Sequence, residues 1–358
     1  MTELAGQLRV VMIIIDAMPH RHVSPALTPN LWGQASTGGR APMGALSLPV
    51  SVTYANHAAF VTGVDPTITG VHGNHTWTDD GWTPAPKLGP RATTLFERVR
   101  AAGGTSAMVV GDQKLVGQMG GSSARAVWPP DGRLPDGTER CLFGYASDAA
   151  VLAALDGIDL DVDVAVIHLN EPDTTSHLFG PDSPEAFEQY RATDAAYGEV
   201  IGQLADAWDS TLVLTVSDHD QETITDLTPV ELAEAFATIE GVDVADEGTA
   251  ALVHRAPGSI DDDRLTDLIR SVDGVEAAMA LTPEIWMAWT EPGRAFGTTP
   301  IPIHGQHGSP RCRTQMAIVS GGDVRVGGVA RQLERSQPSV LDWAPMIARL
   351  LQLDEGST

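Results

Sequence analysis

Three apolar segments of the sequence each lead into an acidic residue. Asp16 follows VVMIII, Asp173 follows VAVIHLNEP, and Asp218 follows LVLTVS, with His219 next to it. Continuous apolar runs of this length are typical of strands covered on both faces in a parallel sheet. Because the carboxyl ends of parallel strands open onto one edge, we expect these side chains to meet there. One such carboxylate is commonly a helix cap, but three with histidines nearby indicate a metal site.

Further histidines follow at spacings that suit a shared metal ion. His177 lies four residues after Asp173, so both side chains share one face if this segment is helical. His307 lies in IHGQHGSP, a glycine-rich turn that would hold it rigidly. Carboxylates and imidazoles without thiolates suit Zn²⁺, Mn²⁺ or Mg²⁺, and the number of histidines favours zinc.

A hydroxyl group completes the chemistry that these residues offer. The stretch LPVSVTYANHAAFVTGV leads through Thr53 into a predicted helix that begins near Asn56. Backbone N–H groups and the helix dipole favour an anion at such a position. An isolated threonine is more often a satisfied core side chain, so Thr53 is a candidate nucleophile only in combination with the metal site.

The elements that must position these groups alternate between strands and helices. This order predicts an α/β fold with a doubly wound, mostly parallel sheet flanked by helices. The predicted strands cover residues 8–15, 106–110, 162–169 and 211–216, and the predicted helices cover 56–62, 92–102, 147–155, 184–208 and 338–353. Residues 225–297 differ in character, with helices at 230–237 and 259–271 and strands at 250–254 and 274–280. We expect them to form a small α+β subdomain inserted into a core of residues 1–224 and 298–358.

Composition limits the class of protein and its partners. A net charge of −25 repels nucleic-acid backbones and anionic lipid, so neither is an expected partner. It also disfavours phosphate esters unless bound divalent cations supply positive charge. Cys141 and Cys312 form no CxxC pair and are expected to be free thiols in a reducing cytosol. With neither a basic leader nor an apolar run of about 18 residues, we expect a cytoplasmic protein.

Taken in order, these motifs resemble the nucleotide pyrophosphatase/phosphodiesterase branch of the alkaline phosphatase superfamily. The similar segments run from near residue 8 to residue 310 and are IIIDAM, SVTYANHAAFVTGVDPTITGVHGNH, LNEPDTTSHLFGP, TVSDHD and GQHGS. The resemblance implies a metal-dependent hydrolase of phosphate esters, expected to be a phosphodiesterase or nucleotide pyrophosphatase acting on a small molecule.

The resemblance also implies a role for each side chain. Thr53 would attack phosphorus and form a covalent phosphoryl-threonine. Asn56 would donate a hydrogen bond to a non-bridging phosphoryl oxygen, aided by the backbone N–H of Tyr54. His307 is preferred to His304 as a ligand because the GQHGS turn matches the family. The expected ligands are Asp173, His177 and His307 for one zinc ion, and Asp16, Asp218, His219 and Thr53 for the other.

The sequence departs from the family pattern after His219, where glycine is usual. Asp220, Gln221 and Glu222 stand there instead. We interpret the added charge as a change in the turn or a contact to a cationic part of the substrate.

The substrate class stays open between several alternatives. Threonine as nucleophile, with no arginine next to it, favours diesters or phosphonates over monoesters. Lys114 lies in AGGTSAMVVGDQKLVGQM, which is similar to a stretch of phosphonoacetate hydrolases and makes carbon–phosphorus hydrolysis the second reading. A phosphomonoesterase and an inactive metal-binding recognition protein are further alternatives. Trp77, Trp82 and Tyr54 either stack on a flat leaving group or anchor their loops.

Overall fold

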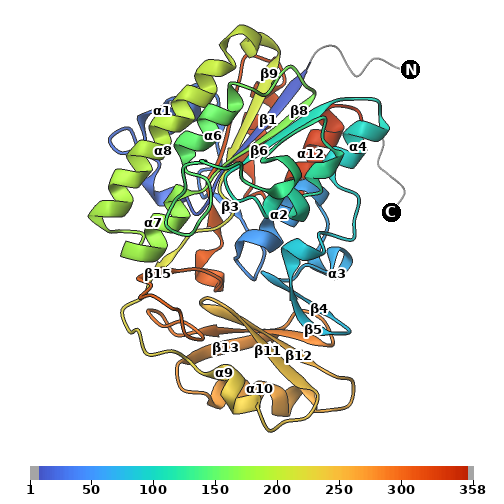
Figure 1. Cartoon of the computed structure of the whole chain (residues 1–358), viewed down its shortest axis with the longest axis vertical. Coiled ribbons are helices and arrows are strands. Elements are labelled where there is room, and N and C mark those ends of the chain that lie inside the picture. Colours follow the sequence, from blue (N-terminus) through green and yellow to red (C-terminus); the bar gives the residue numbers. More distant parts are fainter. Residues whose placement is uncertain (1–7, 354–358) are drawn as a thin grey trace.

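The computed structural model describes residues 8–353, and its centre is a seven-stranded sheet (Figure 1). The strand order is β2-β17-β9-β1-β8-β6-β7. β1 (Arg9–Ile15) pairs in parallel with β8 (Val164–Leu169) on one side and β9 (Thr211–Val216) on the other. The remaining strands are β6 (Ser106–Val110) and β7 (Ala126–Trp128), both parallel to β8, β17 (Ala317–Ser320), antiparallel to β9, and the short β2 (Gly39–Arg40). The predicted fold class is confirmed.

Alternate residues of β1 enter two separate cores, as side chains with a period of two must. Val10, Met12 and Ile14 pack with the helices of one face, and Val11, Ile13 and Ile15 with those of the other. The first face is covered by α2 (Thr53–Thr62), α4 (Leu95–Ala101), α11 (Val326–Arg335) and α12 (Trp343–Leu350). The second is covered by α1 (Pro29–Thr37), α6 (Asp148–Leu155) and α8 (Pro184–Gln203).

Helix boundaries differ from the prediction where local signals compete. Helix α8 begins as expected, with the Ser183 hydroxyl accepting from the N–H of Ala186. It ends at Gln203, and a 3₁₀ segment (Ala205–Ser210) follows where a continuous helix to residue 208 was predicted. Helices α1 and α11 were not predicted, and α11 contains two adjacent glycines that weaken its helical signal.

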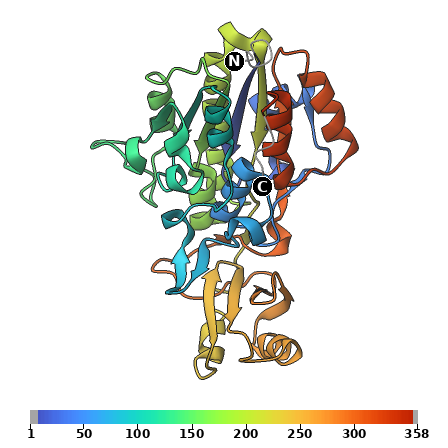
Figure 2. The same ribbon diagram turned by 90° about the vertical axis from the view of Figure 1, so that its right-hand side faces the viewer.

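Residues between β10 (Glu222–Thr223) and β15 (Gly305–Gln306) form a separate antiparallel sheet below the main body (Figures 1 and 2). This sheet has its own core together with α9 (Leu232–Phe236) and α10 (Asp262–Ser271). Its strand order is β11-β12-β14-β13, from β11 (Val242–Glu247), β12 (Ala250–Arg255), β13 (Val275–Ala280) and β14 (Ile285–Thr290). Two of these strands, β11 and β14, were not predicted. We call residues 225–297 the inserted subdomain.

A hairpin of the core lies against the inserted subdomain. It consists of β4 (His75–Thr78) and β5 (Gly81–Pro84). Trp77 stacks on His254 of β12 with ring centroids 3.6 Å apart, and Trp82 packs edge-on against Trp77 at 5.2 Å. Within residues 8–353 no helix combines the length and hydrophobicity needed to cross a membrane.

Candidate active site

The three acidic residues lie together at the carboxyl edge of the central sheet. Asp16 directly follows β1, and Asp218 follows β9. Asp173 lies in the first turn of α7 (Glu171–Phe179), which follows β8. Thr53 is the first residue of α2. The parallel pairing of β1 with β8 and β9 therefore brings together groups up to about 200 residues apart in the chain.

One group of ligand atoms surrounds the Thr53 hydroxyl. Its Oγ1 lies 3.2 Å from His219 Nε2. The same nitrogen lies 3.2 Å from Asp218 Oδ2 and 3.6 Å from Asp16 Oδ1. The N–H groups of Ala17 and His219 donate to Asp218 Oδ1, which leaves Oδ2 directed at the group.

A second group of ligand atoms adjoins the first. His177 Nε2 lies 3.3 Å from Asp173 Oδ1, and His307 Nε2 lies 3.7 Å from it. The Nδ1–H of His177 donates to the carbonyl of Gly305 and that of His307 to the carbonyl of Ser51, so both Nε2 atoms are left for a metal ion. The rings of His219 and His307 stack at 3.8 Å and join the two groups.

His304 lies outside this site. Its side chain is exposed, and its backbone N–H donates to the carbonyl of His177. The structure therefore places His307, and not His304, beside Asp173.

The residues that depart from the family pattern have partners of their own. Gln221 Nε2 donates to Asp173 Oδ1 at 2.7 Å and so orients a predicted ligand. Asp220 pairs with Arg21, and Glu222 pairs with Arg311. The interpretation of Asp220 as a contact to a cationic substrate is not supported, because its carboxylate is engaged by Arg21.

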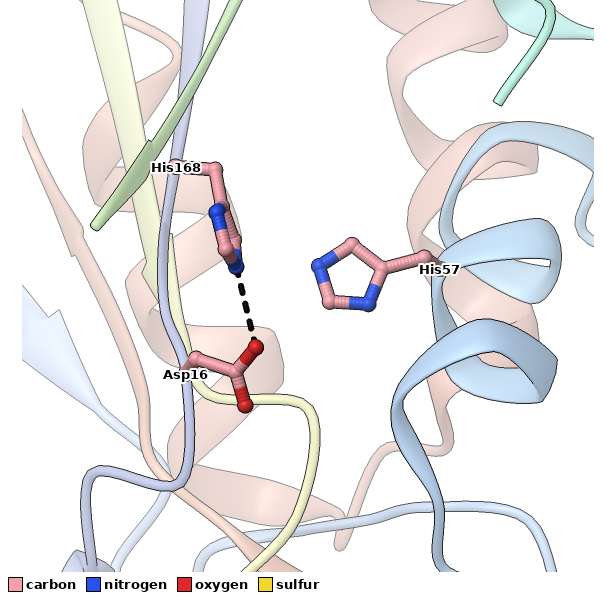
Figure 3. Close-up of side chains that lie close together, drawn as sticks. All are labelled: Asp16, His57 and His168. Atoms are coloured by element: carbon pink, nitrogen blue, oxygen red, sulfur yellow. Dashed lines mark hydrogen bonds and ion pairs between the residues drawn. The ribbon is translucent and has the colours of Figure 1, made fainter. Parts of the chain in front are cut away.

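Two buried histidines, His57 and His168, lie close to Asp16 (Figure 3). His168 Nε2–H donates to Asp16 Oδ2 at 3.1 Å, which leaves Oδ1 for the ligand group. His57 Nδ1–H donates to the carbonyl of Thr53 at 2.8 Å and fixes the first turn of α2. The rings of His57 and His168 lie 5.1 Å apart. Such contacts orient ligands without contacting the metal.

The donor set fits divalent cations. Asp16 Oδ1 and Asp218 Oδ2 are buried and lack a hydrogen-bond partner within residues 8–353. Burial, Asp218 and Asp173 together raise the pKa of Asp16 well above its usual range. Burial also acts to raise the pKa of Asp173, but His177 and His307 hold it below its usual value. Three carboxylates and three imidazoles without a thiolate suit hard or borderline divalent metals.

The ligand groups open into a cavity of about 280 Å³. It is lined by Asp16, Thr53, Asp173, His177 and His307, and beyond these by Tyr54, Asn74, Asp112, Lys114, Phe143, Tyr145 and Asn170. The Tyr54 hydroxyl donates to Asp112 at 2.9 Å. Lys114 is exposed, with Nζ 5.4 Å from the ring centre of Tyr145 and 5.9 Å from that of Tyr54.

Asn56 does not reach this cavity, which corrects the expectation for its side chain. It is fully buried, its Oδ1 accepts from the N–H of Leu48, and its Nδ2 donates to the carbonyl of Val52. Asn74 lines the cavity instead, and its Oδ1 accepts from the N–H of Tyr54 at 3.0 Å. The backbone N–H of Tyr54, which was expected to contact the phosphoryl group, is therefore already bonded to Asn74. The NH₂ group of Asn74 is left to donate to a ligand. Asn74 lies within the similar segment TGVHGNH, but its spacing alone gave no signal.

The aromatic residues divide between the two roles that the sequence left open. Trp77 and Trp82 pack on the inserted subdomain and anchor their hairpin. Tyr54 lines the cavity.

A family model described as type I phosphodiesterase / nucleotide pyrophosphatase matches residues 10–282. The chain belongs to this family. Members are metal-dependent phosphoester hydrolases, so the chain is an enzyme of this type with divalent metal sites. The expected membership of the alkaline phosphatase superfamily is thereby confirmed. A search of curated protein sequences gave no match.

Solved structures show the same fold across nearly the whole chain. Murine ectonucleotide pyrophosphatase / phosphodiesterase 5 is 15% identical, with a TM-score of 0.73 over 96% of this chain and 95% of its own. Phosphonoacetate hydrolase from Sinorhizobium meliloti 1021, in complex with phosphonoacetate, is also 15% identical, with a TM-score of 0.72 over 97% of this chain and 96% of its own. An ectonucleotide pyrophosphatase / phosphodiesterase and a phosphonoacetate hydrolase thus share this fold.

We expect Asp16→Asn to stabilise the metal-free protein at pH 8. Since the folded-state pKa of Asp16 is raised, its carboxylate destabilises the metal-free fold increasingly as pH rises. The melting temperature without metal should rise by roughly 2–6 °C at pH 8, with little change near pH 4. Zinc should stabilise the wild type far more than the variant. Scanning fluorimetry with EDTA or ZnCl₂ measures both, and a less stable metal-free variant at pH 8 would contradict the analysis.

Asn74 and Asn56 form a matched pair for mutation. Asn74→Ala should lower kcat/KM by about 10²–10³-fold, as expected for loss of a donor to a developing oxyanion. It should lower the melting temperature less than Asn56→Ala does, because the bond that it removes, from the N–H of Tyr54, is only part-buried. Asn56→Ala should instead lower the free energy of unfolding by about 1–3 kcal/mol, because the N–H of Leu48 loses its acceptor. Its folded fraction should keep near wild-type kcat. A large loss of kcat/KM in Asn56→Ala, with near wild-type kinetics in Asn74→Ala, would return the phosphoryl contact to Asn56.

Proposed function

We propose that this enzyme hydrolyses phosphate diesters or nucleotide pyrophosphates through a covalent phosphoryl-Thr53 intermediate at two Zn²⁺ ions. The observation that carries the proposal is the position of the Thr53 hydroxyl. It lies at the start of α2, lines the cavity, and is 3.2 Å from His219 Nε2 within a cluster of buried acidic ligands.

The residues support a two-step displacement. Asp16, Asp218 and His219, with Thr53, would hold one cation, and Asp173, His177 and His307 the other. When bound, such cations would lower the pKa of hydroxyl groups and offset negative charge on phosphoryl oxygens. Thr53 Oγ1 would then form a bond to phosphorus while the bond from phosphorus to the leaving oxygen breaks. Water would cleave the phosphoryl-threonine and restore the hydroxyl.

Asn74 would take the place first assigned to Asn56. With its oxygen held by the N–H of Tyr54, its NH₂ can donate to a non-bridging phosphoryl oxygen. A donor fixed before the reaction stabilises the charge that develops in the transition state without reorganisation.

The cavity favours a diester over a monoester. A monoester carries an additional negative charge, which an arginine clamp commonly offsets. Apart from the histidine ligands, Lys114 is the basic residue among those lining the cavity, and the buried carboxyl of Asp112 lies near it.

Lys114 also supports a second candidate, a phosphonate that bears a carboxylate. Its exposed ammonium group at the cavity could pair with a carboxylate while Thr53 attacks phosphorus and the carbon–phosphorus bond breaks. The carbon would leave with its electron pair and take a proton from water.

The decisive experiment compares substrates with zinc-loaded enzyme. We expect kcat/KM for p-nitrophenyl thymidine 5′-monophosphate to exceed that for p-nitrophenyl phosphate and p-nitrophenyl phenylphosphonate at least tenfold. Phosphonoacetate, assayed by phosphate release, should be turned over more slowly still. Preference for phosphonoacetate, with a loss of about 100-fold in Lys114→Ala, would establish the second candidate. No turnover of any of them would reject both.

The Thr53→Ala variant tests the covalent step. We expect it to lose turnover by at least about 10⁴-fold, since the variant lacks the hydroxyl that lies beside His219 and would form the intermediate. The six remaining side-chain ligands should still bind zinc, measured by inductively coupled plasma mass spectrometry. Asp218→Asn, by comparison, should lose both turnover and metal. An active Thr53→Ala enzyme would exclude phosphoryl-Thr53.

A further inference from the structure

The turn between β11 and β12 of the inserted subdomain contacts two loops of the candidate active site. The N–H of Thr249 donates to the carbonyl of His307 at 2.7 Å, and its hydroxyl accepts from the N–H of Ser309 at 3.0 Å. The residue before the turn, Glu247, contacts the loop that carries Asn74. One hairpin thus contacts His307, a predicted metal ligand, and Asn74, the predicted hydrogen-bond donor to a phosphoryl oxygen.

Glu247 is a buried carboxylate, with 3% of its surface exposed. It accepts three hydrogen bonds, from Asn74 N–H at 2.7 Å, His75 N–H at 2.9 Å and His75 Nδ1–H at 3.0 Å. A buried carboxylate without partners is costly, whereas these donors satisfy both of its oxygens. Its bonds therefore hold the backbone at Asn74 and His75.

Asn74 is fixed on every side except the one that would meet a ligand. Its N–H donates to Glu247, its carbonyl accepts from the N–H of Ala85, and its Oδ1 accepts from the N–H of Tyr54. These bonds leave the side-chain NH₂ group of Asn74 free to donate to a ligand. Removal of Glu247 would release the backbone that determines where this group lies.

Glycines permit the close approach of the hairpin. A Cβ on Gly73 would lie 2.8 Å from Glu247 Cδ, and a Cβ on Gly248 would lie 2.3 Å from the carbonyl oxygen of His307. A side chain at Gly248 would push the hairpin away from the His307 loop, and one at Gly73 would displace the carboxylate of Glu247.

We propose that the inserted subdomain is a positioning element of the active site, in which Glu247 sets the place of the Asn74 amide. The inference rests on the proposed role of Asn74. Glu247 is a positioning residue, since it does not line the cavity and acts through Asn74. Attachment of the hairpin β4–β5 to the subdomain has a separate basis in the stack of Trp77 on His254. Substitution of Glu247 should therefore leave the subdomain in place.

Glu247→Gln tests the proposal with little change in shape. Its amide would turn an NH₂ toward an N–H donor, so one of the bonds to Asn74 and His75 would be lost. We expect kcat to fall at least tenfold, with KM within threefold and zinc content unchanged. Glu247→Asp, which keeps the charge, should recover part of the loss. The matched control is Asp243→Asn on the same strand, an exposed position that should stay within twofold of wild type.

A double-mutant cycle separates positioning from general destabilisation. If Glu247 acts through Asn74, the double variant Asn74→Ala, Glu247→Gln should be no slower than Asn74→Ala alone. Losses that multiply, or a Glu247→Gln enzyme within twofold of wild type, would overturn the proposal.

Hydrogen–deuterium exchange of the zinc-loaded protein tests the same inference without turnover. Amides of residues 73–76 should exchange at least tenfold faster in Glu247→Gln, with those of β8 unchanged. If exchange is faster in Glu247→Gln but the wild type turns over none of the substrates, the role of Glu247 in positioning Asn74 stands and the proposed function is rejected. Unchanged exchange in an active enzyme would reject the positioning alone.

Discussion

Burial of three neighbouring carboxylates is the constraint on which this structure depends. Asp16, Asp173 and Asp218 are all nearly inaccessible to solvent, and the pKa of Asp16 is raised by burial and by the other two. The carboxylate oxygens that remain unpaired face imidazole nitrogens instead of lysine or arginine. Such an arrangement is unfavourable for the protein alone and favourable once divalent cations are bound. The buried negative charge at this edge of the sheet therefore favours the binding of divalent cations.

The rest of the core serves to hold this arrangement. Parallel pairing of β1 with β8 and β9 delivers the acidic residues to one edge. His168 and Gln221 then orient the carboxylates of Asp16 and Asp173 by hydrogen bonds, and His57 holds the first turn of α2 through the carbonyl of Thr53. Because each supporting side chain is buried, its hydrogen bond is protected from competition with water.

The inserted subdomain extends this support to the second half of the site. Its hairpin contacts the loops of Asn74 and His307 through hydrogen bonds. A subdomain with a core of its own thus meets the catalytic core where small displacements would matter most. Its place beneath the main sheet is visible in Figures 1 and 2.

The fold class and the meeting of Asp16, Asp173 and Asp218 could be predicted from the sequence, because the carboxyl ends of parallel strands open onto one edge of the sheet. The family and the histidine ligands could be predicted from the order of the motifs that resemble it. Which asparagine lines the cavity could not be predicted, because it depends on packing between distant segments. Asn56, one helical turn after Thr53, points into the core, where two backbone groups consume its amide. Asn74 arrives through a loop whose path depends on Glu247, 173 residues away. Contacts of that range leave no periodicity in the sequence, so packing alone sets them.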